Sequence, residues 1–417
     1  GGGAADPVLG GPTGVGTQGA RIARSLVATA PRRMRGFSHV PFQPAGGLER
    51  PAMDMPFALS LSPYLDAARE NLVSWAAAMG ILSEGVWDEP RLRAIDLALC
   101  AAGIHPDATA DQLDLTSGWL AWGTYGDDYY PAVFGCRRDI AGAKACNARL
   151  AAFMPLDLAT MPVPVTPLER GLADLWTRTA GPAGPAARGM VRRSIQEMTE
   201  SWIWELVNQS QNHIPDPVDY VEMRRKTFGS DLTMSLARLA APAPLPAAVS
   251  RSRPFEAMEN AAADYACLLN DVFSYQKEIE FEGEIHNCVL VVQNFLDCDA
   301  ADGMRVVGDL MNARMRRFRH AVAVELPALL DALEASAGVR EASYGHARRL
   351  ENWLSGILNW HEGCHRYAEA DLIGGRPSAI PGIPGIPGIP GIPGQNPKPV
   401  FPNGSPLLPP PRLLHAR

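Results

Sequence analysis

Three oxygen-bearing side chains recur at a regular spacing in the second half of the chain. Asn270, Ser274 and Glu278 stand four residues apart, which places them on one face of an α-helix, each one turn above the last. A carboxamide, a hydroxyl and a carboxylate in one column suit a hard divalent cation such as Mg²⁺, which prefers oxygen ligands. Apolar neighbours such as Leu269 and Phe273 predict that the helix is partly buried, so the polar stripe needs a partner. A surface helix with ordinary polar residues is the alternative.

Two adjacent carboxylates form a second candidate site, in the segment GTYGDDYYPAVF. Asp127 and Asp128 follow an apolar helical pattern with two tryptophans, and Pro131 is expected to end that helix. Like charges repel, and both burial and the negative end of a helix add to the cost of ionising them. A bound cation would offset these costs, whereas a solvated helix end followed by a turn would avoid them.

Basic side chains that suit a diphosphate stand on both sides of the first pattern. Arg224 and Arg225 precede Asn270 by 46 and 45 residues, and Arg366 with Tyr367 lies near the end of the last helical segment. A guanidinium can grip phosphate oxygens through two parallel hydrogen bonds, and a phenol can donate a further one. Surface salt bridges are the alternative role for these residues.

Helical periodicity dominates residues 55–372, and no run of alternating, strand-like residues interrupts it. We therefore predict one all-α domain of about ten or more helices over this range. Residues 1–54 are rich in Gly, Pro, Ala and Arg and are expected to form a flexible, linker-like segment. Residues 373–417 contain five I-P-G triplets and are expected to form an extended, disordered tail.

The composition narrows the class of protein. Hydrophobic residues make up 47% of the 417 residues and charged residues 20%, which is typical of a globular protein with a substantial core. A net charge of −7 argues against nucleic acid and against a basic, membrane-binding surface as partners. No segment is long and apolar enough to span a membrane. The seven scattered cysteines, without a C-x-x-C pair, predict reduced thiols in a cytoplasmic protein.

The order of these features resembles the class I terpene synthases over residues 55–372. An acidic pair comes first, then an arginine, then N-x-x-x-S-x-x-x-E and finally an Arg-Tyr pair. The segments GDDYYP, NDVFSYQKE and EIEFEGEIHNCVLV are similar to the germacradienol/geosmin synthase family, and most similar to its C-terminal domain. The resemblance implies an all-α bundle around a deep apolar cavity, with the two motifs facing each other across its mouth.

The resemblance also implies roles for individual residues and a Mg²⁺ cofactor of three ions. It makes Asp127, together with Asp128, the first metal-binding motif and Asn270, Ser274 and Glu278 the second. Arg224 or Arg225 would sense the substrate diphosphate, while Arg366, Tyr367 and Lys277 would hold it. The usual first motif carries a further acid three or four residues on, but Tyr130, Pro131 and Ala132 occupy that region here.

We consider three hypotheses for the function, the first two of which follow from this resemblance. The first is a terpene synthase domain that converts germacradienol to geosmin with loss of acetone, preceded in a longer protein by another terpene synthase domain. The second is a stand-alone class I sesquiterpene cyclase that ionises farnesyl diphosphate. The third is a non-catalytic helical module that binds apolar ligands or partners.

Overall fold

The computed structural model describes residues 41–83, 85–157, 160–239 and 245–374, and these residues are helical without any strand. The prediction of an all-α fold is confirmed. The expected I-P-G tail and residues 1–40 lie outside the described residues. The helices are α2 (Leu65–Met79), α3 (Glu89–Ile95), α4 (Leu97–Ile104), α5 (Ala110–Tyr130), α6 (Ile140–Leu150), α7 (Pro167–Ala180), α8 (Pro185–Ser210), α9 (Pro217–Thr227), α10 (Ser230–Leu239), α11 (Ala247–Ser250), α12 (Arg253–Gln276), α13 (Cys288–Leu296), α14 (Ala300–His320), α15 (Leu326–Ala332), α16 (Ala337–Gly363) and α17 (Glu369–Gly374).

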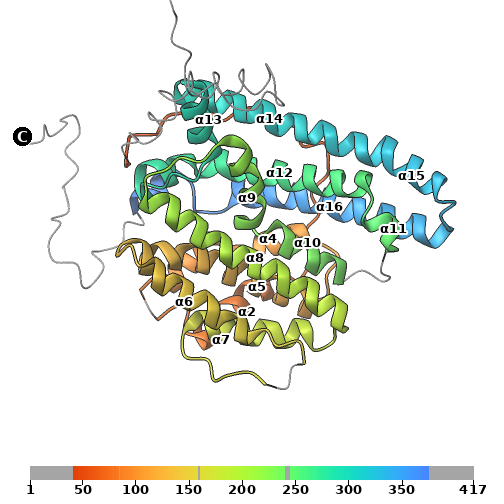
Figure 1. Ribbon diagram of the computed structural model, residues 1–417, viewed down its shortest axis with the longest axis horizontal. Coiled ribbons are helices and arrows are strands. Elements are labelled where there is room, and N and C mark those ends of the chain that lie inside the picture. The colour runs from red at the N-terminus through yellow and green to blue at the C-terminus, as the bar shows by residue number, and fades with distance from the viewer. Residues whose placement is uncertain (1–40, 84, 158–159, 240–244, 375–417) are drawn as a thin grey trace, which may run out of the picture. The chain divides into compact units, whose positions relative to one another are not determined.

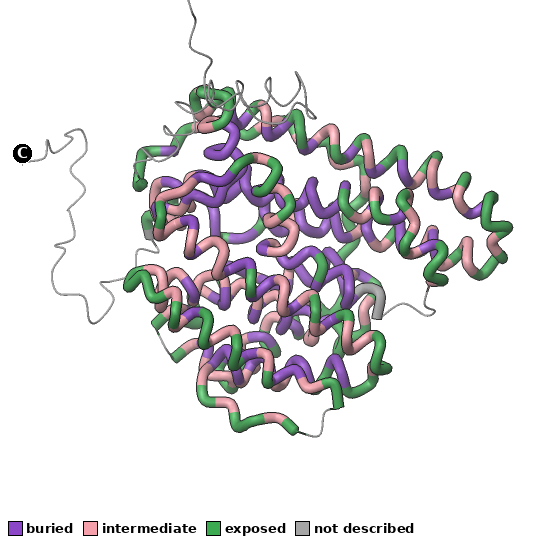
Figure 2. Tube along the Cα trace, in the orientation of Figure 1, coloured by how far each residue is buried: buried purple, intermediate pink, exposed green. Residues whose placement is uncertain are grey.

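Helix α12 is the central element of the bundle. Ser252 caps its N-terminus by accepting a hydrogen bond from the backbone N–H of Phe255. Every residue from 261 to 275 is buried, so this helix is enclosed on all sides rather than amphipathic (Figure 2). It packs against α14 and α16, which lie beside it in Figure 1, and also contacts α9 and α13. A polar group on α12 is therefore held in a desolvated setting.

Helix α5 leads the second group of helices, which includes α2, α4, α7 and α8. Thr109 caps its N-terminus in a reciprocal capping box with Gln112. We expected Pro131 to end this helix, and α5 does end at Tyr130 with Pro131 as its C-cap, but the chain does not leave the helical path there. The helical path continues through a π-helical segment, η3 (Pro131–Gly135), because Pro131 adopts helical backbone angles at the first position of the wider turn.

The two groups of helices meet where α4 crosses α16. Gly103 and Gly356 face each other there, and a Cβ atom built on Gly356 would lie 2.2 Å from the carbonyl carbon of Gly103. Only glycine permits so close an approach of two helix backbones. Since α16 also packs along α12, this contact fixes the position of the helix that leads to Arg366 and Tyr367.

The described segment before α2 packs on the bundle from Ala45 onward. Ala45 donates its backbone N–H to Glu280 at 3.0 Å, and the side chain of Asn312 bonds the backbone of Ala52 and Asp54. The predicted boundary at residue 54 therefore falls inside a segment with fixed contacts. Within the described residues, no helix is long and apolar enough to cross a membrane.

The glycine contact gives a direct test of the packing. We expect Gly356→Ala to lower the free energy of unfolding by about 1–3 kcal/mol, because the added methyl forces α4 and α16 apart. Gly345→Ala on the same helix is the matched control, since only the ends of Arg348 and Arg349 approach it. That control should be neutral or stabilising by about 0.5–1 kcal/mol. Thermal unfolding of both variants measures the difference, and an equal effect of the two would contradict the crossing.

Candidate active site

The two motifs predicted from the sequence come together at the ends of α5 and α12. Asp128, in the last turn of α5, accepts a hydrogen bond from Arg366 Nη2 at 2.9 Å. Tyr367, the next residue, accepts one from Asn270 Nδ2 on α12 at 3.1 Å. The charge of Arg224 also influences the pKa of both Asp127 and Glu278. Residues separated by more than 140 positions thus form one charge cluster.

The adjacent carboxylates of the first motif have different environments. Asp128 accepts hydrogen bonds from Trp87 Nε1 at 2.8 Å and Arg91 Nη2 at 3.1 Å in addition to that from Arg366. Burial alone would raise the pKa of Asp128, but the two guanidinium groups outweigh burial and hold it well below its usual range. Asp128 is therefore firmly bound as an anion.

Asp127 makes no hydrogen bond to any residue that the structure describes. Its side chain is half-buried, and burial together with the neighbouring charge of Asp128 raises its pKa to about 6. The open carboxylate of the first motif is thus Asp127.

The second motif spans a change of helix type. Asn270 and Ser274 lie on α12, whereas Glu278 is the second residue of a π-helical segment, η5 (Lys277–Glu282). The Oγ atom of Ser274 is buried and finds no hydrogen-bond partner among the residues that the structure describes. Glu278 accepts one hydrogen bond, from Asn287 Nδ2 at 2.8 Å, and burial raises its pKa to about 8. Both oxygen groups are left short of partners.

Arg224 and Arg225 diverge, as adjacent residues on a helix must. Arg224 donates from Nη2 to Asn270 Oδ1 at 2.5 Å and from Nε to Asp271 Oδ1 at 2.9 Å. Arg225 instead binds Asp264 at 2.6 Å, on another part of α12. Only Arg224 therefore reaches the charge cluster.

The remaining predicted residues lie at the same site. Lys277 donates to Glu282 at 2.6 Å, and its charge lowers the pKa of Asp128. The ring of Tyr367 stacks on that of His361, with centroids 5.3 Å apart. Both Arg366 and Tyr367 are buried, so their donors are shielded from water.

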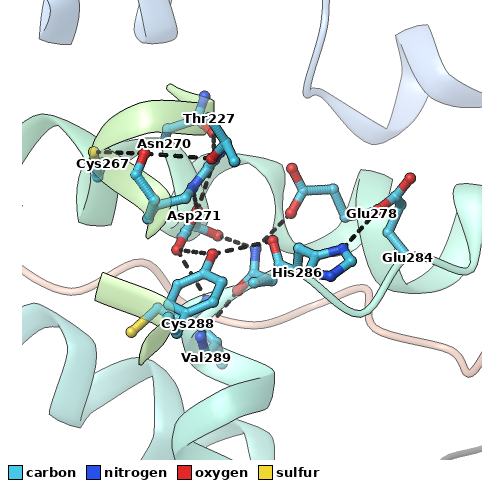
Figure 3. Close-up of polar contacts among 12 residues, drawn as sticks. Thr227, Cys267, Asn270, Asp271, Glu278, Glu284, His286, Cys288 and Val289 are labelled. Carbon is cyan, nitrogen blue, oxygen red and sulfur yellow. Dashed lines mark hydrogen bonds and ion pairs between the residues drawn. The ribbon is translucent and has the colours of Figure 1, made fainter. Parts of the chain in front are cut away.

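Four residues that the sequence analysis did not single out complete the site. Figure 3 shows Asp271, which is fully buried and accepts hydrogen bonds from Tyr220 Oη at 2.7 Å and the backbone N–H of Cys288 at 2.9 Å. The others are Asn287, the N-cap of α13; His361 on α16; and Glu205 on α8. Burial and the charge of Asp127 raise the pKa of Glu205 well above its usual range. Asp271 follows Asn270 directly, which was the only signal in the sequence.

These side chains suit a divalent cation that also binds non-protein oxygens. Within the described residues, no three His, Cys, Asp or Glu side chains lie close enough together to hold a metal ion. The available protein ligands are Glu278, Asp127, the unpartnered Ser274 Oγ and Asn270 Oδ1. Mg²⁺ commonly takes one or two carboxylates and fills its octahedral shell with water and phosphate oxygens. The donor set therefore fits Mg²⁺ together with an anionic ligand.

Comparison with known proteins agrees with this geometry. The family model described as terpene synthase family 2, C-terminal metal binding, matches residues 118–317, which include both motifs. Pristinol synthase of Streptomyces pristinaespiralis is 28% identical over 333 residues, covering 78% of this chain and 87% of that protein. The (+)-T-muurolol synthase ((2E,6E)-farnesyl diphosphate cyclizing) of Roseiflexus castenholzii is 27% identical, covering 75% and 92%.

A solved structure shares the fold. The germacradien-4-ol synthase of Streptomyces citricolor superposes with a TM-score of 0.66 at 22% identity, over 75% of this chain and all of that one. The chain is similar to the class I terpene synthases over 75–78% of its length, and its enzyme class is that of the lyases that cyclise terpenes. None of these relatives is a germacradienol/geosmin synthase, so that narrower affiliation stays a prediction.

Because the two aspartates have different environments, replacing each one with asparagine should change the stability of the protein in opposite directions. Asp128→Asn should cost about 3 kcal/mol of stability, because it leaves the buried guanidinium of Arg366 without a charged partner. Asp127→Asn should keep or raise the melting temperature at pH 8, since it removes a partly desolvated carboxylate without a partner. Thermal unfolding of the metal-free variants at pH 8 tests this, and equal losses would show that the two carboxylates are equivalent.

Proposed function

We propose that the chain is a Mg²⁺-dependent sesquiterpene cyclase that ionises and cyclises farnesyl diphosphate. The observation that carries this proposal is the buried, unpartnered hydroxyl of Ser274, which lies between Asn270 and Glu278 in the charge cluster of Asp127. The full name of the Roseiflexus relative, which specifies farnesyl diphosphate, supports the choice of substrate. The expected apolar cavity for the isoprenoid chain remains part of this proposal.

We assign metal binding to the oxygen-bearing side chains of the cluster. Asn270, Ser274 and Glu278 would hold Mg²⁺ on the α12 side, and Asp127 would do so on the α5 side, for three ions in all. Bound Mg²⁺ would supply Lewis-acid stabilisation of the departing diphosphate.

Four donors of this chain would bind the diphosphate directly: Arg224, Lys277, Arg366 and Tyr367. Each guanidinium is already fixed by an acid on its far side, Arg224 by Asp271 and Arg366 by Asp128. We therefore assign Asp128 to holding Arg366 rather than to binding metal.

Conversion of germacradienol to geosmin with loss of acetone is the second candidate. It is favoured by a first motif with a single open carboxylate, since Asp128 is held by two arginines and no further acid follows in Tyr130, Pro131 and Ala132. Such a motif offers fewer metal ligands than diphosphate ionisation usually employs. The non-catalytic module gives no account of the unpartnered hydroxyl of Ser274.

Product analysis distinguishes these functions. The purified chain should convert farnesyl diphosphate with Mg²⁺ to a cyclic hydrocarbon or alcohol, detected by mass spectrometry. Glu278→Gln should lower kcat/KM about 100-fold or more, because it removes a negatively charged ligand of nearly the same shape. Glu280→Gln is the control: Glu280 lies in the same segment but bonds Ala45 and Gln276.

A second incubation, with germacradienol in place of farnesyl diphosphate, tests the geosmin reaction. Geosmin and acetone from that incubation, with no product from farnesyl diphosphate, would replace the first function with the second.

Proton release should accompany Mg²⁺ binding. The pKa of Glu278, about 8, exceeds its ordinary value of 4.5, and that of Asp127 is about 6, so protons compete with the ion below these values. The pKa of Glu278 is higher in the folded chain than in the unfolded chain, so folding favours the protonated acid. The stability of the metal-free chain therefore falls as the pH rises through about 8. The rise in melting temperature produced by Mg²⁺ should therefore be larger at pH 8.5 than at pH 6. A shift independent of pH in wild type, or the same pH dependence in Glu278→Gln, would contradict this.

A further inference from the structure

The carboxamide of Asn270 is held at both of its ends. Its Oδ1 atom accepts the hydrogen bond from Arg224 Nη2 at 2.5 Å. Its Nδ2 atom lies 2.9 Å from His361 Nε2 and 3.1 Å from the hydroxyl of Tyr367. The two ends of a carboxamide have nearly the same shape but opposite hydrogen-bonding character, so their partners decide which one faces a cation.

The partners on the two ends assign the same orientation independently. Arg224 can only donate, so it must face the oxygen of Asn270. On the other side, His361 Nδ1 lies 2.8 Å from the carbonyl oxygen of Ile357, which can only accept, so Nδ1 carries the proton. In the neutral ring Nε2 is then an acceptor and must face an N–H group. Burial lowers the pKa of His361 to about 3, in agreement with a neutral ring.

We propose that His361 is a positioning residue that turns the oxygen of Asn270 toward the bound cation. This inference rests on the proposed function, because it assigns Asn270 Oδ1 to Mg²⁺. An ion at that oxygen competes with Arg224, which can remain bound to Asp271. Tyr367 offers a hydroxyl that can donate or accept and so does not distinguish the two ends. His361 alone among these three contacts both opposes a reversed carboxamide and leaves the oxygen free for the ion.

The imidazole is fixed well enough to perform this role. Besides its hydrogen bond within α16, the ring stacks on Tyr367 with an interplanar angle of 14° and packs against Phe273 at 5.2 Å. It is 2% exposed, so water does not replace Asn270 as its partner. The side chain therefore presents Nε2 in one direction only.

Three variants separate positioning from packing. His361→Phe keeps an aromatic ring but removes the acceptor, while His361→Gln restores a polar atom that can accept near the position of Nε2. His346→Phe is the matched control, because His346 is also buried and stacked on a ring, that of Phe255, but bonds Glu259 instead. Isothermal titration with Mn²⁺ and inorganic pyrophosphate measures the affinity without turnover, and circular dichroism measures the fold.

We expect His361→Phe to weaken Mn²⁺-pyrophosphate binding 10- to 100-fold, the usual effect of losing a residue that orients a metal ligand. His361→Gln should recover most of that loss, and His346→Phe should bind as wild type does. The KM for Mg²⁺ should rise with that of farnesyl diphosphate less affected.

Three results would overturn the proposal. One is wild-type affinity in a folded His361→Phe. The second is a folded His361→Gln variant that binds Mn²⁺-pyrophosphate as weakly as an Asn270→Ala variant does. This result applies even if His361→Phe fails to fold. The third is a wild-type chain that binds neither ion nor pyrophosphate, which would remove the proposed function as well as the inference that rests on it.

Discussion

The enclosure of several carboxylates in one desolvated region is the constraint on which the rest of the structure depends. Asp128 and Asp271 each have a guanidinium beside them, from Arg366 and Arg224 respectively. Among the residues that the structure describes, Asp127, Glu205 and Glu278 form no such ion pair, and burial raises the pKa of each, as it does that of Asp271. A folded protein keeps such groups only where something compensates for their cost, and positively charged ligands are the simplest compensation.

Adjacent residues of a motif can have different hydrogen-bond partners. In Asp127-Asp128, the first residue makes no hydrogen bond to the described residues and the second binds Arg366, whereas Asn270 and Asp271 both accept hydrogen bonds from Arg224. A residue that looks like a second metal ligand in the sequence can thus be the anchor of a cationic side chain. The structure separates Arg224 from Arg225 in the same way, since the latter binds Asp264.

The sequence was sufficient for the fold class, but not for the contacts between the segments that carry the candidate site. Periodicity predicted the helices because burial of one face repeats every 3.6 residues. It could not predict that η5 widens the turn at Glu278, or that Asn287 and His361 approach the motif from distant segments. These depend on tertiary packing, as does the attachment of the chain at Ala45, which composition alone placed in a flexible segment.

The close contact between Gly103 and Gly356 links the packing of the core to the candidate site, because Gly356 and His361 lie on the same helix. His361 lies five residues beyond Gly356 on α16, about 7.5 Å along the same rigid helix. Any enlargement at the crossing would be transmitted along that helix to the imidazole. A contact between two glycines, distant from any charged group of the site, would then influence the position of a side chain that bonds Asn270.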